Sequence, residues 1–147
     1  MSQPPKSLSD YLTNTRGFEC GRNDTVECYD TNSVYNCSCN NIYDYKYLLG
    51  ILNSKVVTFW FNTAYLNIDN IFPHIQKNQL ESIPIVDSDF RDKIESLSSS
   101  ILAGKVDIVN MMTQIDLLVY SLYNLTYDEI CIIDPKTDIM REVYEIT

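Results

Sequence analysis

The sequence predicts an α+β fold, with a small β-sheet region followed by a mainly helical C-terminal half. Two observations support this prediction. Short runs of alternating β-branched and aromatic residues, separated by turn formers, occupy residues 18–39, whereas from residue 43 onward apolar residues recur at every third or fourth position. Two of these helical stripes meet at Gly104, which predicts an antiparallel helical hairpin.

A β-hairpin is expected in the first region. Residues 25–29 and 34–37 alternate in the manner of strands, and the polar residues 30–33 form a turn between them. A first amphipathic helix is then expected from Tyr43 to Asn62. Its apolar stripe consists of Leu48, Leu52, Val56, Phe59 and Trp60.

Less regular segments follow this helix. Residues 65–74 have the composition of a loop, and residues 77–82 suit one or two helical turns. Residues 83–86 are expected to be extended, because a residue that precedes a proline avoids the helical conformation.

Two long helices are predicted next. The first is capped by Asp87 or Ser88 and ends at Gly104. Its buried stripe consists of Phe90, Ile94, Leu97 and Ile101. The second helix ends at Asn124, and its stripe consists of Ile108, Met112, Ile115, Val119 and Leu122.

A short helix should follow, because Thr126 to Glu129 has the pattern of a capping box. It is expected to stop before Pro135, and residues 136–147 form a charged, partly helical tail. With 45% hydrophobic and 21% charged residues, the chain has the composition of a folded protein. We expect one domain over 1–147, divided into a lead-in at 1–17, a β-rich part with the first helix at 18–86, a helical hairpin with a short helix at 87–134, and a tail at 135–147.

The charge balance limits the functions that the chain can have. Eleven Lys and Arg stand against 20 Asp and Glu, so the net charge is −9. This net charge argues against a protein that coats nucleic acid without specificity. It does not exclude a small basic patch on an otherwise acidic surface. No stretch approaches the roughly 20 apolar residues of a membrane span, and no signal peptide is visible, so we expect a cytoplasmic protein without membrane contact.

The cysteines do not have the spacing of a structural metal site. There are five, an odd number that favours free thiols over disulfides, namely Cys20, Cys28, Cys37, Cys39 and Cys131. Paired zinc ligands usually have two to four residues between them, whereas one residue separates Cys37 from Cys39 and seven separate Cys20 from Cys28. Buried small hydrophobic residues are the favoured interpretation, and a zinc site is the less favoured alternative.

The sequence also lacks the residues of a common catalytic site. His74 is the single histidine, and no Gly-x-Ser-x-Gly element accompanies it. We interpret it as a loop residue, with a position near a phosphate as the less favoured alternative. The 4 glycines are scattered, which excludes a phosphate-binding glycine loop. Asp134 and Lys136 match half of a nuclease motif but lack its remaining elements, so we expect no catalysis by this chain.

The 11 tyrosines allow two interpretations. Tyr43, Tyr45 and Tyr47 cluster at the start of the first expected helix, just before its apolar stripe, and Tyr120 and Tyr123 lie on the second long helix. Aromatic side chains can stack on bases, but residues at helical spacing are more often part of a packed core. Packing is the favoured interpretation here.

Three segments together resemble a known family. They are residues 45–55 (YKYLLGILNSK), 77–85 (KNQLESIPI) and 115–130 (IDLLVYSLYNLTYDEI). Their order and spacing are similar to those of the C-terminal specificity domain of type IIG restriction-modification enzymes, the TaqI-like and Eco57I-like enzymes. The resemblance extends over about residues 22–134, and a weaker one links residues 83–85 and the following helix to type I specificity subunits.

This resemblance implies a DNA target-recognition domain that binds double-stranded DNA. Separate methyltransferase and endonuclease modules of the parent enzyme would carry out catalysis with S-adenosylmethionine and Mg. The chain itself would need no cofactor and no metal. Asn124 stands where the family commonly has glycine, and either residue suits the end of a helix.

Reading of bases requires polar side chains that reach the groove edges. On this basis, the candidate DNA contacts are Arg22, Asn23, Lys46, Lys55, His74, Gln76, Lys77 and Asn78. We expect Asn53, in contrast, to satisfy nearby backbone groups. The alternative function is a protein–protein docking scaffold of a restriction-modification complex that does not read DNA by itself.

Overall fold

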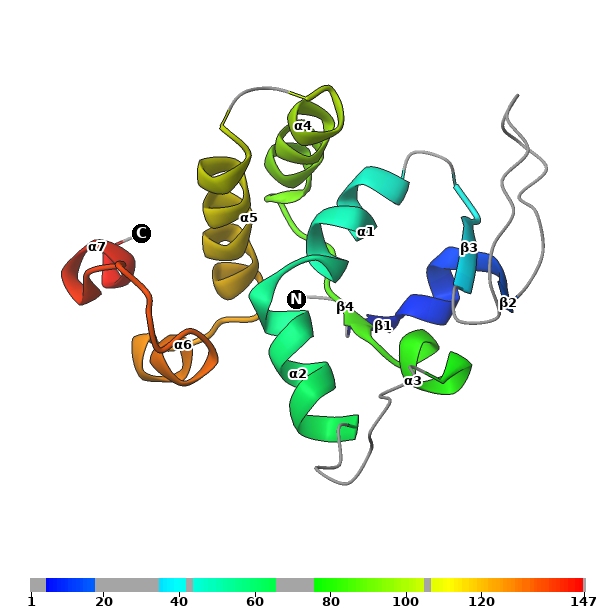
Figure 1. The fold of residues 1–147 in the computed structure, drawn as a ribbon, viewed down its shortest axis with the longest axis horizontal. Coiled ribbons are helices and arrows are strands. Elements are labelled where there is room, and N and C mark those ends of the chain that lie inside the picture. Colours follow the sequence, from blue (N-terminus) through cyan, green and yellow to red (C-terminus); the bar gives the residue numbers. More distant parts are fainter. Residues whose placement is uncertain (1–4, 18–34, 42–43, 66–75, 105–106, 147) are drawn as a thin grey trace. The chain divides into compact units, whose positions relative to one another are not determined.

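The computed structural model describes residues 5–17, 35–41, 44–65, 76–104 and 107–146 (Figure 1). These residues are mostly helical and include short antiparallel strand pairs, which confirms the predicted α+β class. The elements are β1 (Lys6–Ser7), η1 (Leu8–Tyr11), β2 (Leu12–Gly17), β3 (Tyr35–Cys39), α1 (Tyr45–Leu52), α2 (Lys55–Tyr65), α3 (Lys77–Glu81), β4 (Pro84–Ile85), α4 (Arg91–Leu102), α5 (Ile108–Leu122), α6 (Tyr127–Ile133) and α7 (Arg141–Glu145). No described helix has the length and apolar character needed to cross a membrane.

The chain forms two compact units, each built from two segments. The first consists of Met1–Tyr45 and Tyr65–Val86, and the second consists of Lys46–Ala64 and Asp87–Thr147. The change of unit after Val86 coincides with the boundary that the sequence suggests. Most of the first predicted helix, however, falls in the second unit with the helical hairpin.

In the first unit, β2 and β3 form an antiparallel ribbon with Thr15 opposite Cys37. Strand β3 confirms the second strand of the predicted hairpin, whereas residues 25–29 lie outside the described residues. The sequence analysis missed β2 as the partner of β3. Its sequence, LTNTRG, has one large apolar residue and so shows no alternation that would indicate a strand.

The lead-in is also part of this unit. Strand β1 pairs with β4, and the Leu8 N–H donates a 2.7 Å hydrogen bond to the carbonyl of Ile83. The Ser7 hydroxyl donates to the carbonyl of Glu81 at 2.6 Å, at the end of α3. Because Leu8 and Ile83 are buried, this N-terminal segment fixes α3 and the extended residues after it. Helix α3 and the extended segment were both predicted, and both are confirmed.

In the second unit, the prediction of one helix over residues 43–62 is wrong. The structure contains two helices, α1 and α2, separated at Asn53 and Ser54. The Ser54 hydroxyl donates to the carbonyl of Ile51 at 2.7 Å, and the Lys55 N–H donates to the Asp116 carboxylate at 2.9 Å. The Lys55 N–H thus has a side-chain acceptor in place of a helical carbonyl. Asn53 donates from its side-chain amide to the carbonyl of Leu49, a structural contact of the kind expected for it.

Helices α4 and α5 lie side by side and antiparallel, which confirms the predicted helical hairpin (Figure 1). Ile94 of α4 and Ile115 and Val119 of α5 are fully buried. The predicted stripe on α5 is wrong at its N-terminal end, because Ile108 is 48% exposed there. Gly104 ends the first helix of the pair with φ of 71°, as its position after the stripe predicts.

Helix α5 ends in a Schellman motif. Asn124 has φ of 52°, its N–H donates to the carbonyl of Ser121, and the N–H of Leu125 donates to the carbonyl of Tyr120 at 3.0 Å. The predicted capping box then starts α6, and α7 forms the helical part of the tail.

The left-handed conformation of Asn124 allows a stability test. Replacement of Asn124 by alanine should lower the free energy of unfolding by about 1 kcal/mol, because a Cβ without a polar group disfavours positive φ. Asn124→Gly is the matched control and should be as stable as the wild type or slightly more stable. Urea unfolding measures both changes, and equal stability of the two variants would contradict the proposed role of φ.

Candidate nucleic-acid interface

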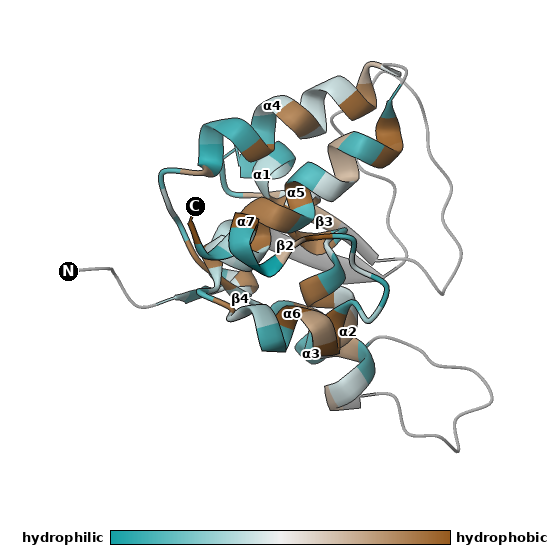
Figure 2. Ribbon diagram, turned by 90° about the vertical axis from the view of Figure 1, so that its left-hand side faces the viewer, coloured by the Kyte–Doolittle hydropathy of each residue, from teal (hydrophilic) through white to brown (hydrophobic). Residues whose placement is uncertain are grey.

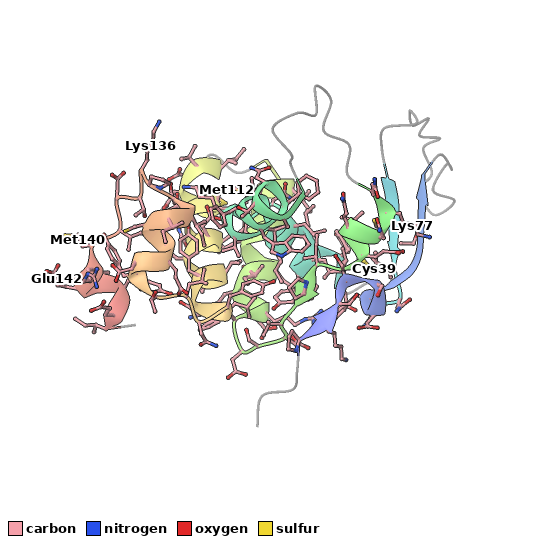
Figure 3. All side chains as sticks on the ribbon, turned by 90° about the horizontal axis from the view of Figure 1, so that it is seen from below. Cys39, Lys77, Met112, Lys136, Met140 and Glu142 are labelled. Carbon is pink, nitrogen blue, oxygen red and sulfur yellow. The ribbon has the colours of Figure 1, made fainter. Side chains whose placement is uncertain are left out.

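Three candidate DNA contacts lie together at the start of α3. Gln76, Lys77 and Asn78 are all exposed, and 54% of the Lys77 side chain is accessible to solvent. Lys77, labelled in Figure 3, forms an ion pair with Glu81 one helical turn away, with 3.7 Å between Nζ and Oε1. The helix therefore presents two amides and one partly neutralised ammonium group to solvent.

Local hydrogen bonds fix the backbone at this position. The N–H of Gln76 donates to the side-chain oxygen of Gln79 at 2.9 Å, and the N–H of Gln79 donates to Asn78 Oδ1 at 3.0 Å. The amide nitrogen of Asn78 has no hydrogen-bond acceptor among the described residues and is available to a ligand. The other end of α3 is held by Ser7, as described above, so the polar side chains are carried by a short but anchored helix.

The remaining candidates fall into two groups. Arg22, Asn23 and His74 lie outside the described residues, and their role remains a prediction. Lys46 and Lys55 belong to the second unit, where Lys46 lies half-buried in the first turn of α1.

Lys55 has structural contacts at both ends. Its Nζ lies 2.5 Å from the carboxylate of Asp134, and its backbone N–H is bound to Asp116. Half of the side chain is exposed, so a phosphate could approach the ammonium group only in competition with Asp134.

Asp116 lines a pocket with mostly polar walls, which the sequence analysis missed. It has a volume of about 240 Å³ and is lined by residues that include Lys55, Asp116, Tyr120 and Asp134. Burial raises the pKa of the Asp116 carboxyl, and the hydrogen bond and charge of Lys55 oppose this effect only in part. Burial also raises the pKa of Tyr120, whose hydroxyl is buried without a hydrogen-bond partner among the described residues. The signal available in the sequence was an aspartate between apolar residues of a helical stripe.

The described residues contain no group of three or more His, Cys, Asp or Glu side chains arranged to bind a metal ion. The expectation of buried cysteines is wrong for Cys37, which is exposed, while Cys39 and Cys131 are half-buried. Cys37 and Cys39 both belong to strand β3, and of the two Cys37 is the one exposed to solvent.

The interpretation of the tyrosines as packed core residues is confirmed for some of them and not for others. Tyr47 and Tyr120 are fully buried, whereas Tyr45 is 43% exposed. The guanidinium of Arg91 stacks on the ring of Tyr47 at 4.9 Å from its centre. Burial also raises the pKa of Tyr123 to about 12.

The described residues thus form an α+β fold in which exposed amide and ammonium groups lie on an anchored short helix. Residues 22–85 match the family model of the TaqI-like C-terminal specificity domain. This match covers less than half of the chain, and it confirms the resemblance for a segment that contains every candidate DNA contact. No curated protein and no solved structure matches the chain.

Proposed function

We propose that this chain is the DNA target-recognition domain of a type II restriction-modification enzyme and positions separate methyltransferase and endonuclease modules on one sequence. The observation that carries this proposal is the specificity-domain match over residues 22–85. In this proposal the chain itself is not catalytic, and S-adenosylmethionine and Mg act in the other modules.

The cluster on α3 supplies suitable chemistry for reading bases. Amide side chains such as those of Gln76 and Asn78 can donate and accept in the pattern that the major-groove edge of adenine offers. The Lys77 ammonium can contact a phosphate or a guanine. Since Glu81 already offsets part of its charge and the chain carries −9, most of the attraction to phosphates would come from the other modules of the enzyme.

The test is a selection of bound duplexes from a randomised DNA pool at low salt with the full chain. We expect one enriched sequence motif. Gln76→Ala and Asn78→Ala should each relax the preference at single base positions, a loss of about 1–3 kcal/mol of discrimination per base contact. Lys77→Ala should weaken binding to all sequences and reduce the salt dependence.

Lys136→Ala is the matched control for Lys77→Ala, because Lys136 is exposed and lies outside the matched segment (Figure 3). It should leave the enriched motif and the affinity unchanged. A folded protein that enriches no sequence would contradict the proposal. That outcome would favour the second candidate function, a docking scaffold, which the exposed apolar groove described below supports.

A further inference from the structure

We propose that the α4–α5 hairpin docks a basic amphipathic helix of a partner protein in an apolar groove with an acidic rim. This inference is independent of DNA reading by the first unit. Two adjoining hollows, of about 670 and 810 Å³, form the groove and share Lys93, Leu117 and Leu118. The first extends to Leu97 and Gln114. The second extends to Leu125 and to the tail residues before and within α7.

The floor and the tail wall of the groove are apolar. Leu97, Leu117, Leu118 and Leu125 are half-buried, and Met140 and Val143 of the tail are 64% and 56% exposed. Apolar residues extend along α4 and α5 in Figure 2, and the Met140 side chain projects outward in Figure 3. Exposed and half-buried apolar residues that gather along one groove are typical of a protein-binding site.

The length of the groove fits a helix. It runs along α5 from Gln114 to Ser121, which corresponds to about 10 Å at the helical rise per residue, and it continues past the end of the helix to Leu125. A partner helix of about three turns can place apolar residues spaced at i, i+3 or i+4, and i+7 over this distance.

The charges around the groove indicate a basic occupant. Asp92 and Asp138 line it, and neither has an ion-pair partner among the described residues. The exposed Asp89 and Glu142 are adjacent in sequence to lining residues. Among the residues that the structure describes, Lys93 is the one cationic side chain that lines the two hollows.

The arginines beside the groove do not offset this acidity. Arg91 forms ion pairs with Asp87 and Glu95. Arg141 forms ion pairs with Asp128 and Glu145. A second copy of the chain would bring the same acidic rim and a further net charge of −9, so self-association through this face is electrostatically unfavourable. A helix with an apolar stripe flanked by lysine or arginine fits this groove. Its stripe packs on the apolar floor, and its cationic side chains lie opposite the acidic rim.

The experiment is a display selection of helical peptides of about 14 residues against the full chain. The peptides keep a leucine stripe, and their flanking positions vary between Lys and Glu. We expect the enriched peptides to carry Lys on both flanks. Asp92→Asn with Asp138→Asn should weaken their binding about fivefold, because two rim charges are lost. Leu118→Asp should abolish binding.

The matched control is Asn62→Lys with Thr63→Lys at two exposed positions of α2, which changes the net charge equally and involves no residue that lines the groove. It should bind the peptides as the wild type does. Enrichment of acidic peptides, no enrichment, or equal weakening in the control would overturn the proposal. A dimer in sedimentation that Leu118→Asp dissociates would also overturn it, in favour of a second copy. The DNA selection repeated with the double aspartate variant should be unchanged, which separates this proposal from the proposed function.

Discussion

Gly50→Ala is expected to lower the free energy of unfolding by about 2–3 kcal/mol, although alanine is the better helix former. Gly50 lies in α1, and a Cβ atom at this position would be 2.6 Å from Cγ2 of Ile94 and 2.9 Å from Oγ of Ser98. Both of these neighbours are buried on α4, so neither can move without a disturbance of the hairpin. At an open helical position, the same substitution would stabilise the protein by about 1 kcal/mol.

Chemical denaturation measures this change, and the chain provides a matched control. Gly104→Ala places a methyl group in open space and should cost only the strain of its positive φ, about 1 kcal/mol. Ile94→Ala should be less destabilising in the Gly50→Ala background than in the wild type, since it removes the clashing methyl group. Wild-type stability of Gly50→Ala would show that the helices are not in close contact at this position.

The second large effect is expected at Asp116. Asp116→Ala should lower the free energy of unfolding by about 2 kcal/mol, because the Lys55 N–H at the start of α2 loses its acceptor in a part-buried place. Asp116→Asn keeps an acceptor oxygen and should lose less. Gln114→Ala on the exposed side of the same helix is the control and should be close to neutral.

The pH dependence of this effect has a definite sign. Burial raises the pKa of Asp116 in the folded protein, so the folded state binds the proton more tightly than the unfolded state does. The contribution of Asp116 to stability is fully present below the ordinary aspartate pKa and is lost as the pH rises through the raised folded value. The stability of Asp116→Asn relative to the wild type should therefore increase between about pH 3 and pH 7. A constant difference over this range would contradict the raised pKa.

Local signals in the sequence were sufficient for the helices of the C-terminal half. The stripe around Ile94 and Ile115, the stop at Gly104 and the capping box at Thr126 each depend on residues within a few positions of one another. Such patterns specify a helix and its ends without knowledge of the tertiary fold. The α4–α5 hairpin followed directly from them.

Features that depend on distant residues were not predictable in this way. The break between α1 and α2 involves Asp116 as an acceptor for Lys55, 61 residues away in the sequence. Strand β2 has almost no apolar residues and is recognisable through its pairing with β3. At the candidate site, the exposure of Lys77 was predictable from the polar residues next to it in the sequence. The ion pair of Lys55 with Asp134 was not predictable, because the two residues are 79 positions apart.

The alternation of the two units along the chain has a consequence for synthesis on the ribosome. Strand β1 is made early, but its partner β4 emerges only after α1 and α2 have appeared. At ordinary elongation rates, β1 therefore waits for about 4–16 s without its partner. Helices α1 and α2 in turn remain without α4 and α5 until the second half is complete. Each unit thus passes through a period in which an unpaired strand edge or an uncovered apolar helix face is exposed to other chains, and chaperones would have most effect during that interval.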